Sequence, residues 1–301
     1  MQDIAQLVII GLVVGSIVGL GATGLTLTYG VLRFANFAHG DLMTLGMFLA
    51  FFIVGNLGLN GGEVGPFSFG WGLLPAAMFS MAGVAAVTIT LDRMVFRPLR
   101  RRGSGSIAMA IASLGFAIML RAVIQMFWGP GTERYTSGIH PATTIVGGLK
   151  VKPDQFFIVG LTVVLAVAVY LLLHRTKLGK AMRATSDNPD LAEVAGIDTE
   201  RIRQATWAVG GSLIAIAGIM LAIQSQLHFD AGFQLLLPMF AAAILGGIGN
   251  PWGALVGGLV VGVSQEVSTE WINPGLKPGV PFVILIGMLL VRPRGLFGSA
   301  I

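Results

Sequence analysis

The fold class is decided by residues 4–42, IAQLVIIGLVVGSIVGLGATGLTLTYGVLRFANFAHGDL. From Ile4 to Leu32 this stretch has no charged side chain. It is longer than the ~20 apolar residues that a helix needs to cross the hydrocarbon core of a membrane. An arginine, an asparagine, a histidine and an aspartate then interrupt it before the next apolar block. We therefore predict a retained membrane span followed by a polar interruption.

The composition of the whole chain points the same way. The 301 residues are 54% hydrophobic and 11% charged, and the mean hydropathy is +0.82. A soluble domain has about 25% charged residues, so most of this chain cannot face water. We predict an all-α, polytopic transmembrane helical bundle that forms one transmembrane domain over residues 1–301. The short alternating segments of an outer-membrane barrel are not seen in the sequence.

Apolar runs with polar or Gly/Pro punctuation predict eight or nine spans. They lie near residues 4–30, 41–59, 72–91, 106–128, 156–173, 205–227, 233–249, 252–268 and 280–291. The last span is short, and only GNPW separates the seventh from the eighth. A count of eight therefore stays open.

The basic residues predict the orientation. Most of the 19 Lys and Arg residues follow the first, third, fifth and last spans: Arg33, Arg93, Arg97, Arg100, Arg101, Arg102, Arg175, Lys177, Lys180, Arg183, Arg201, Arg203, Arg292 and Arg294. Strict alternation of nine spans puts all of these on one side, which the positive-inside rule makes cytoplasmic. We predict an outside N-terminus and a cytoplasmic C-terminus. The net charge of +5 is then a topology signal, and no nucleic-acid partner is expected.

Glycines recur inside the spans at four-residue spacing. They are Gly11, Gly15 and Gly19, then Gly253 with Gly257, and Gly258 with Gly262. Small residues at this spacing lie on one helix face and let backbones approach closely. We interpret them as helix-packing positions; glycines that flex during gating are the alternative.

The only long charged segment is residues 174–203, HRTKLGKAMRATSDNPDLAEVAGIDTERIR. Within it, Asp187 or Asn188 can serve as an N-cap, Pro189 suits the first helical position, and Gly196 is a suitable C-terminal stop. These signals predict a helix of about two turns. A helix this short is unstable alone in water, so it is either a connector on the lipid headgroups or a knob that docks on a soluble partner.

Four blocks of the sequence resemble branched-chain amino acid ABC permeases of the LivH type. GKAMRATSDNPDLAEVAGID, residues 179–198, resembles their cytoplasmic coupling loop. GLTLTYGVLRFANFAHGDLMTLG, residues 24–46, is similar to their N-terminal signature. AAAILGGIGNPWGALVGGLVVG, residues 241–262, and LLVRPRGLFG, residues 289–298, resemble later family segments. The blocks occur in family order across nearly the whole chain.

The resemblance implies an importer subunit in the bacterial inner membrane rather than an enzyme. It implies ATP-binding subunits on the cytoplasmic face, a second permease subunit (a different permease is favoured over a homodimer), and an extracytoplasmic solute-binding protein. The residues carried over to the ATPase contact are Arg183, Asp187, Asn188, Ala192 and Gly196. The chain itself has no Gly-x-x-x-x-Gly-Lys-Ser/Thr loop, since Gly179-Lys180 lacks the upstream glycine and precedes Ala181.

The polar interruption near residues 33–40 is either a tight cytoplasmic turn or a broken helix below the surface. The first apolar block is too long for one straight span, which favours the break. Broken helices often mark transport sites, so Asn36, Phe37, His39 and Gly40 are candidate translocation-path residues. We interpret Asn36 and His39 as capping the break in preference to contacting the solute.

Other polar residues in the spans are few. Arg121 lies inside the fourth span, so it either extends to the nearby span end, which we favour slightly, or faces protein. Gln224, Gln226, Gln234 and Gln265 lie near outer span ends, as do His228 and Asp230, which are too few for a metal site. With four histidines and no cysteine, neither a metal, a cofactor nor a catalytic cluster is expected.

An autonomous secondary transporter or channel for a small polar solute, such as urea or an amide, is the alternative function. It would require paired charges inside the spans for ion coupling. A membrane enzyme is the third class, and it would need a clustered catalytic set.

Overall fold

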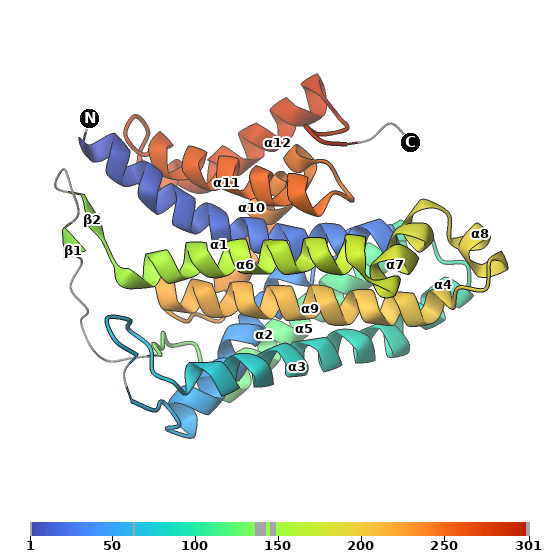
Figure 1. The fold of residues 1–301 in the computed structure, drawn as a ribbon, viewed down its shortest axis with the longest axis horizontal. Helices are drawn as coiled ribbons and strands as arrows, with labels where there is room; N and C mark the ends of the chain where they lie inside the picture. Colours follow the sequence, from blue (N-terminus) through green and yellow to red (C-terminus); the bar gives the residue numbers. More distant parts are fainter. Residues whose placement is uncertain (1, 63, 136–142, 145–148, 299–301) are drawn as a thin grey trace.

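The computed structural model is a bundle of helices that run mostly along one direction (Figure 1). It describes residues 2–62, 64–135, 143–144 and 149–298. Within these ranges, seven helices are long and apolar enough to cross a membrane. The prediction of an all-α polytopic bundle is confirmed.

Each predicted span corresponds to a helix. The elements in chain order are α1 (Gln2–Leu32), α2 (His39–Phe51), η1 (Phe52–Asn56), α3 (Leu73–Leu91), η2 (Asp92–Phe96), α4 (Arg97–Arg101), α5 (Ser106–Trp128), β1 (Thr143–Thr144), β2 (Lys150–Val151), α6 (Pro153–Arg175), α7 (Lys177–Asp187), α8 (Pro189–Val194), α9 (Thr199–Gln224), α10 (Ala231–Gly246), α11 (Pro251–Ser268), η3 (Pro274–Gly279) and α12 (Val280–Val291). The helices α10 and α11, with 16 and 18 residues, are not among the seven long spans.

The most extensive helix contact is between α1 and α11, where the spaced glycines meet. A Cβ atom added at Gly15 would lie 2.8 Å from Cα of Leu259, and one added at Gly258 would lie 2.2 Å from Cα of Gly19. At Gly262 the distance to Cα of Gly15 would be 2.4 Å. These are shorter than any real Cβ contact, so only glycine allows this approach. The packing interpretation of the glycines is confirmed.

The core consists of α1, α2, α9 and α10. Their buried side chains include Ile17, Leu42, Met43, Ile214 and Met239, each at most 1% exposed. By contrast, only 11% of the residues are buried over the stretch Pro274–Val291, which comprises η3 and α12, and only 22% over the most apolar window of α6. Helices with such wide exposed apolar faces are expected to contact lipid or another membrane subunit.

The basic segments lie together at one end of the bundle, which we call the basic end (Figure 1). It holds α4, α7, α8 and the turn after α12. Arg33 lies there too, because its guanidinium bonds to the end of α7. The N-terminus, β1 and β2 lie at the opposite end. There β1 pairs with β2 in antiparallel register, Thr143 opposite Val151. The basic segments that the sequence analysis places on one side thus lie at one end of the bundle, and the assignment of that end to the cytoplasm stays a prediction.

Candidate functional site

The polar interruption folds back into the bundle. The first helix ends at Leu32, and Arg33 has a φ of 55°, in the left-handed region. His39, the first residue of α2, places Nε2 2.9 Å from the carbonyl oxygen of Gly21. Gly21 lies about 16 Å back along α1 from Leu32, at 1.5 Å per residue. Residues 33–38 therefore re-enter the bundle, and α2 begins inside it, as the broken-helix alternative expected.

The side chains of the break bond to backbone groups of the fold. Oδ1 of Asn36 accepts a hydrogen bond from the backbone N–H of Ala38, 3.1 Å away, just before α2 begins. The backbone N–H of Phe37 donates to Oγ of Ser113 in α5, at 3.0 Å. Asn36 and His39 are each 2% exposed. Free backbone groups inside a bundle need such partners, so this geometry suits a structural break.

An ion pair lies beside the break. Nε of Arg121 is 2.9 Å from Oδ1 of Asp41, and Nη2 of Arg121 is 3.2 Å from Oδ2 of Asp41. The guanidinium carbon also lies 4.0 Å from the ring centre of Phe233 in α10. The expectation that Arg121 extends to a span end is therefore wrong. Asp41, whose side chain is fully buried, attracts the cation into the protein.

The start of α2 packs directly against the start of α10. A Cβ atom at Gly40 would lie 2.6 Å from the carbonyl oxygen of Gly232. The backbone N–H of Gly232 donates to Oγ1 of Thr44, at 3.0 Å. The two helix starts thus meet backbone to backbone, and Gly40 is required there for close approach rather than for flexibility.

At the basic end, the short helix α8 forms where the sequence predicts it. Asn188 is the N-cap: its Oδ1 accepts from the backbone N–H of Asp190 at 3.1 Å and of Leu191 at 3.0 Å. Gly196, with a φ of +84°, ends the helix. The backbone N–H groups of Gly196 and Ile197 close the last turn on the carbonyl oxygens of Glu193 and Ala192. Asn188, and not Asp187, is the cap.

The predicted contact residues of this loop differ in exposure. Arg183, Asp187, Asn188 and Gly196 are exposed, whereas Ala192 is 4% exposed and packs inward. Leu191 and Val194 are 65% and 86% exposed and form an apolar tip on α8. The sequence analysis expected one short helix in the loop, but the preceding residues form a second helix, α7, capped by Thr176.

Hydrogen bonds connect the α7–α8 region to the end of α1. A guanidinium nitrogen of Arg33 donates to the carbonyl oxygens of Ser186, at 2.8 Å, and Asp187, at 3.1 Å. Oγ of Ser186 donates to the carbonyl oxygen of Gly30, at 2.8 Å. The residue that opens the break is therefore bonded to the end of α7, immediately before α8.

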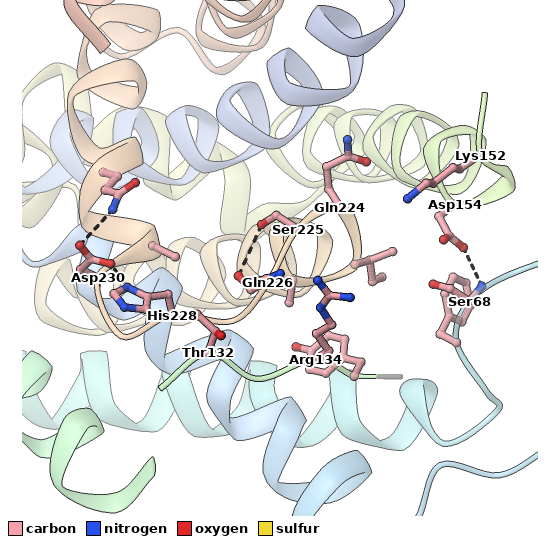
Figure 2. A pocket seen from close by; sticks show the side chains of 16 residues that line it. Ser68, Thr132, Arg134, Lys152, Asp154, Gln224, Ser225, Gln226, His228 and Asp230 are labelled. Carbon is pink, nitrogen blue, oxygen red and sulfur yellow. Dashed lines mark hydrogen bonds and ion pairs between the residues drawn. The ribbon is translucent and has the colours of Figure 1, made fainter. Parts of the chain in front are cut away.

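A polar cavity of about 580 Å³ lies at the opposite end (Figure 2). Its lining comes from the loop before α3, the segment after α5, the start of α6 and the α9–α10 connection: Ser68, Phe69, Thr132, Arg134, Tyr135, Lys152, Asp154, Ala222, Ile223, Gln224, Ser225, Gln226, His228, Asp230, Ala231 and Gln234. Four separate segments thus bring both signs of charge to one cavity.

Hydrogen bonds hold the wall of the cavity. The carboxylate of Asp230 accepts from Nδ1 of His228 and, at 3.0 Å, from Nε2 of Gln234. Burial acts to raise the pKa of Asp230, but these two hydrogen bonds and the charge of His228 outweigh it, so the pKa lies below its ordinary value. Burial raises the pKa of Tyr135, whose hydroxyl donates to the carbonyl oxygen of Met47 at 2.9 Å.

Sequence reasoning found only part of this cavity. The residues Gln224, Gln226, His228, Asp230 and Gln234 stood out as polar groups near span ends. Arg134, Lys152, Asp154 and Ser68 did not, because they lie on loops far apart in the sequence. The only available signal was that Arg134 and Lys152 are cations on the predicted outer side, where cations are few.

Nearly the whole chain is similar to proteins of one known family. A family model described as the permease component of the branched-chain amino acid transport system matches residues 7–289. The chain belongs to this family. It is 30% identical to the high-affinity branched-chain amino acid transport system permease protein BraD of Pseudomonas aeruginosa, over 97% of this chain and 95% of BraD.

Further relatives carry similar names. The high-affinity branched-chain amino acid transport system permease protein LivH of Escherichia coli is 30% identical, over 96% of this chain and 93% of LivH. A probable branched-chain amino acid transport permease protein LivH of Methanocaldococcus jannaschii is 28% identical, over 99% and 94%. The resemblance to LivH-type permeases is confirmed, and the chain is a multi-pass membrane protein of the permease class.

Two of the blocks that carried the resemblance contact each other. The backbone N–H groups of Leu296 and Phe297 donate to the carbonyl oxygens of Leu245, at 2.8 Å, and Gly246, at 3.2 Å. Asn250 caps α11 through its Oδ1 and also donates to the carbonyl oxygen of Phe297, at 3.3 Å. The Gly-Gly-Ile-Gly turn and the C-terminal segment are thus one structural unit of this permease.

Proposed function

We propose that the chain is a membrane-spanning permease subunit of an ATP-binding-cassette importer in the inner membrane. It translocates branched-chain or related amino acids, and partner subunits hydrolyse the ATP. The observation that carries this proposal is the family match over residues 7–289. The permease relatives bear names of branched-chain amino acid transport systems, which supports the choice of solute.

The proposal includes three kinds of partner. An ATP-binding subunit contacts the apolar tip of α8, Leu191 and Val194, at the cytoplasmic face. A different permease pairs through exposed apolar helices, and a solute-binding protein docks at the opposite, extracytoplasmic end. The domain is single, and residues 174–203 form its coupling loop. The exposed apolar tip supports contact with an ATP-binding subunit. Leu191 and Val194 are 65% and 86% exposed, and burial of such apolar side chains against a partner is favourable in free energy.

Uptake of radiolabelled L-leucine tests the proposal in cells that lack their own branched-chain amino acid importers and express the chain with its partners. The double variant Leu191→Ser/Val194→Ser should lose most uptake and release the ATP-binding subunit. The conservative pair Leu191→Met/Val194→Ile should retain both. Full uptake by the serine variant would contradict the docking assignment.

The second candidate function is an autonomous transporter or channel for a small polar solute. The Asp41–Arg121 ion pair favours it, because paired charges inside the bundle are what ion coupling requires. Solute uptake by the chain expressed without any ATP-binding subunit distinguishes the two functions. An importer subunit should show no uptake, whereas an autonomous transporter should take up the solute at the same rate as with the subunit present.

A further inference from the structure

An apolar groove of about 420 Å³ lies between α1, α6 and α11, and it shares no lining residue with the polar cavity. Most of its lining is aliphatic or aromatic, from Leu12 and Val13 of α1, Phe156 and Val163 of α6, and Leu255 and Leu259 of α11. Leu12, Phe156 and Val163 are 40%, 61% and 57% exposed. The groove therefore opens on the outside of the bundle, between the exposed faces of α1 and α6.

The polar side chains of the lining bond to nearby backbone groups. Oγ of Ser16 and Oγ1 of Thr162 each donate to the carbonyl oxygen four residues earlier, at 2.8 Å and 2.9 Å. Oε1 of Gln155 accepts from the backbone N–H of Lys152 at 3.2 Å. Among the described lining residues, no polar atom is exposed to the groove. A ligand there is held by apolar contacts, and the groove selects hydrocarbon.

The groove is too narrow for a helix. Between Gln155 and Val163, α6 rises by about 12 Å, at 1.5 Å per residue. Spread over that length, 420 Å³ gives a mean cross-section of about 35 Å², whereas a helix with its side chains is ~10 Å across and needs about 80 Å². The length is close to half of the ~30 Å hydrocarbon core. These dimensions fit a hydrocarbon chain of one lipid leaflet and exclude a helix of a second permease.

A lysine lies at the end of the groove that is farther from α8, where β2 crosses it (Figure 1). The side chain of Gln6 holds this strand: Nε2 donates to the carbonyl oxygen of Lys150 at 2.8 Å, and Oε1 accepts from its backbone N–H at 2.9 Å. Leu149 and Val151 line the groove. Successive side chains of a strand point to opposite faces, so Lys150 points away from the groove and is exposed. Among the residues that the structure describes, it has no ion-pair partner.

We propose that this groove binds an acyl chain of an anionic phospholipid and that Lys150 contacts the headgroup. The lining takes the chain because a lipid tail is as apolar as leucine. The cation at the end of the groove complements the negative charge of the headgroup. The bound lipid then bridges α1, α6 and α11, whichever solute the permease carries.

Photo-crosslinking tests the site on the permease with the subunits that copurify with it. The complex is reconstituted in vesicles of phosphatidylethanolamine and phosphatidylglycerol that contain a phosphatidylglycerol probe with a diazirine in its acyl chain. It is then extracted in mild detergent, which removes loosely held lipid, and irradiated. Mass spectrometry of the peptides should place the cross-links on the groove faces of α1 and α6.

Two adjacent valines of α6 supply matched variants. Val163, 57% exposed, lines the groove, whereas Val164, 62% exposed, does not. Val163→Trp should fill the mouth of the groove and abolish the cross-links, and Leu12→Trp on the α1 side should do the same. Val164→Trp adds the same bulk beside the groove and should leave the yield unchanged. All three positions are exposed, and size-exclusion chromatography of each complex shows that it is intact.

Two lysines test the headgroup contact. Competition of unlabelled phosphatidylglycerol and phosphatidylcholine against the probe measures the preference for an anionic lipid. Lys150→Gln should lower this preference about fivefold, the effect expected for one basic side chain beside an anionic lipid. Lys152→Gln is the control, because its side chain lines the polar cavity (Figure 2), and it should leave the preference unchanged.

Equal cross-linking in Val163→Trp and Val164→Trp, or no cross-link in the groove, would overturn the lipid site. Cross-links that form in the chain alone but disappear when a second permease is bound would assign the groove to that subunit instead. A preference that Lys150→Gln does not change would overturn the headgroup contact. None of these measurements depends on ATP-driven uptake, so failure of the proposed function is detected separately.

Discussion

At the scale of single residues, the Asp41–Arg121 pair decides how the break is held. The Asp41 carboxylate is fully buried, and the Arg121 side chain is 25% exposed. Two hydrogen bonds and the contact with Phe233 compensate for bringing both charges into the bundle. The pair connects α2 to α5, and Phe233 adds α10 to the same contact. It therefore fixes the start of the re-entrant helix.

Removing one partner of this pair should be more harmful than removing both. Asp41→Asn leaves the partly buried Arg121 inside the bundle without its counter-charge, and we expect the free energy of unfolding to fall by about 3 kcal/mol. The double variant Asp41→Asn/Arg121→Gln should recover part of that loss. Thermal unfolding of the purified permease, followed by size-exclusion chromatography, measures Asp41→Asn, Arg121→Gln and the double variant. A double-variant loss equal to the sum of the two single losses would mean that the two side chains do not interact.

Sequence reasoning could not find this pair, for a physical reason. Asp41 and Arg121 lie on different spans, and each looks like a residue near a span edge when read alone. Only the fold-back of residues 33–38 brings Asp41 into the bundle. The residues His39 and Asn36 were found because a polar run inside an apolar chain is itself a local signal.

At the scale of elements, the glycine contact between α1 and α11 sets how closely these helices pack. Gly262→Ala should destabilise the protein by about 1–3 kcal/mol, because the added Cβ atom would lie 2.4 Å from Cα of Gly15 and force the helices apart. Gly160→Ala in α6 is the matched control, since that position faces open space. Thermal unfolding compares the two variants; equal midpoints would contradict the close packing.

The link from α7 to the break is also a property of elements. Arg33→Gly keeps the left-handed backbone but removes the bonds to Ser186 and Asp187. We expect the partner ATPase to stay bound while solute-stimulated transport falls, because only the hydrogen bond from Ser186 to Gly30 then connects the end of α7 to the end of α1. Copurification and uptake, measured on the same membranes, separate the two effects. Normal uptake would show that these hydrogen bonds do not transmit motion.

The cap of α8 can be tested in the same assay. Asn188→Ala removes the side-chain acceptor for two backbone N–H groups and should cost about 1 kcal/mol of local helix stability. Asn188→Asp keeps an acceptor at that position and should behave like the unaltered chain. We expect reduced uptake only for the alanine variant, with membrane insertion unchanged in both. Equal uptake by the two would mean that a rigid α8 is not required.

The elements were predictable where their signals are local. Asn188, Pro189 and Gly196 mark the two ends of α8, and hydropathy marks the spans. The helix α7 is amphipathic, with Gly179, Met182 and Thr185 on its buried face, but its average hydrophobicity is low. It was missed because the sequence analysis followed apolar runs and caps, and neither marks this helix. Ala192 was placed at the partner contact by resemblance alone, whereas the turn of the helix directs it inward.

At the scale of the whole molecule, the separation of the basic end from the cavity predicts two faces. Because the chain has no cysteine, Asp190→Cys in α8 and Lys150→Cys in β2 can each be labelled alone. An impermeant thiol reagent should reach Asp190→Cys only from the cytoplasmic side and Lys150→Cys only from outside. Labelling of both from one side would overturn the topology.

The exposed apolar helices also concern the whole molecule. Only 11% of the residues are buried over Pro274–Val291, which includes α12, and 22% over the apolar window of α6. A second permease or lipid must cover these apolar faces. Hydropathy predicts that such faces exist, but it does not distinguish lipid from a partner, because a lipid tail is as apolar as leucine. The pairing of subunits therefore has to be measured.

Copurification tests the central claim most directly. The chain is extended with a C-terminal affinity tag and extracted from its own membranes, and every stoichiometric partner is identified. We predict an ATP-binding subunit and a second, different permease in the eluate. A stable homo-oligomer without an ATP-binding subunit, obtained both in mild detergent and in nanodiscs, would contradict the importer assignment.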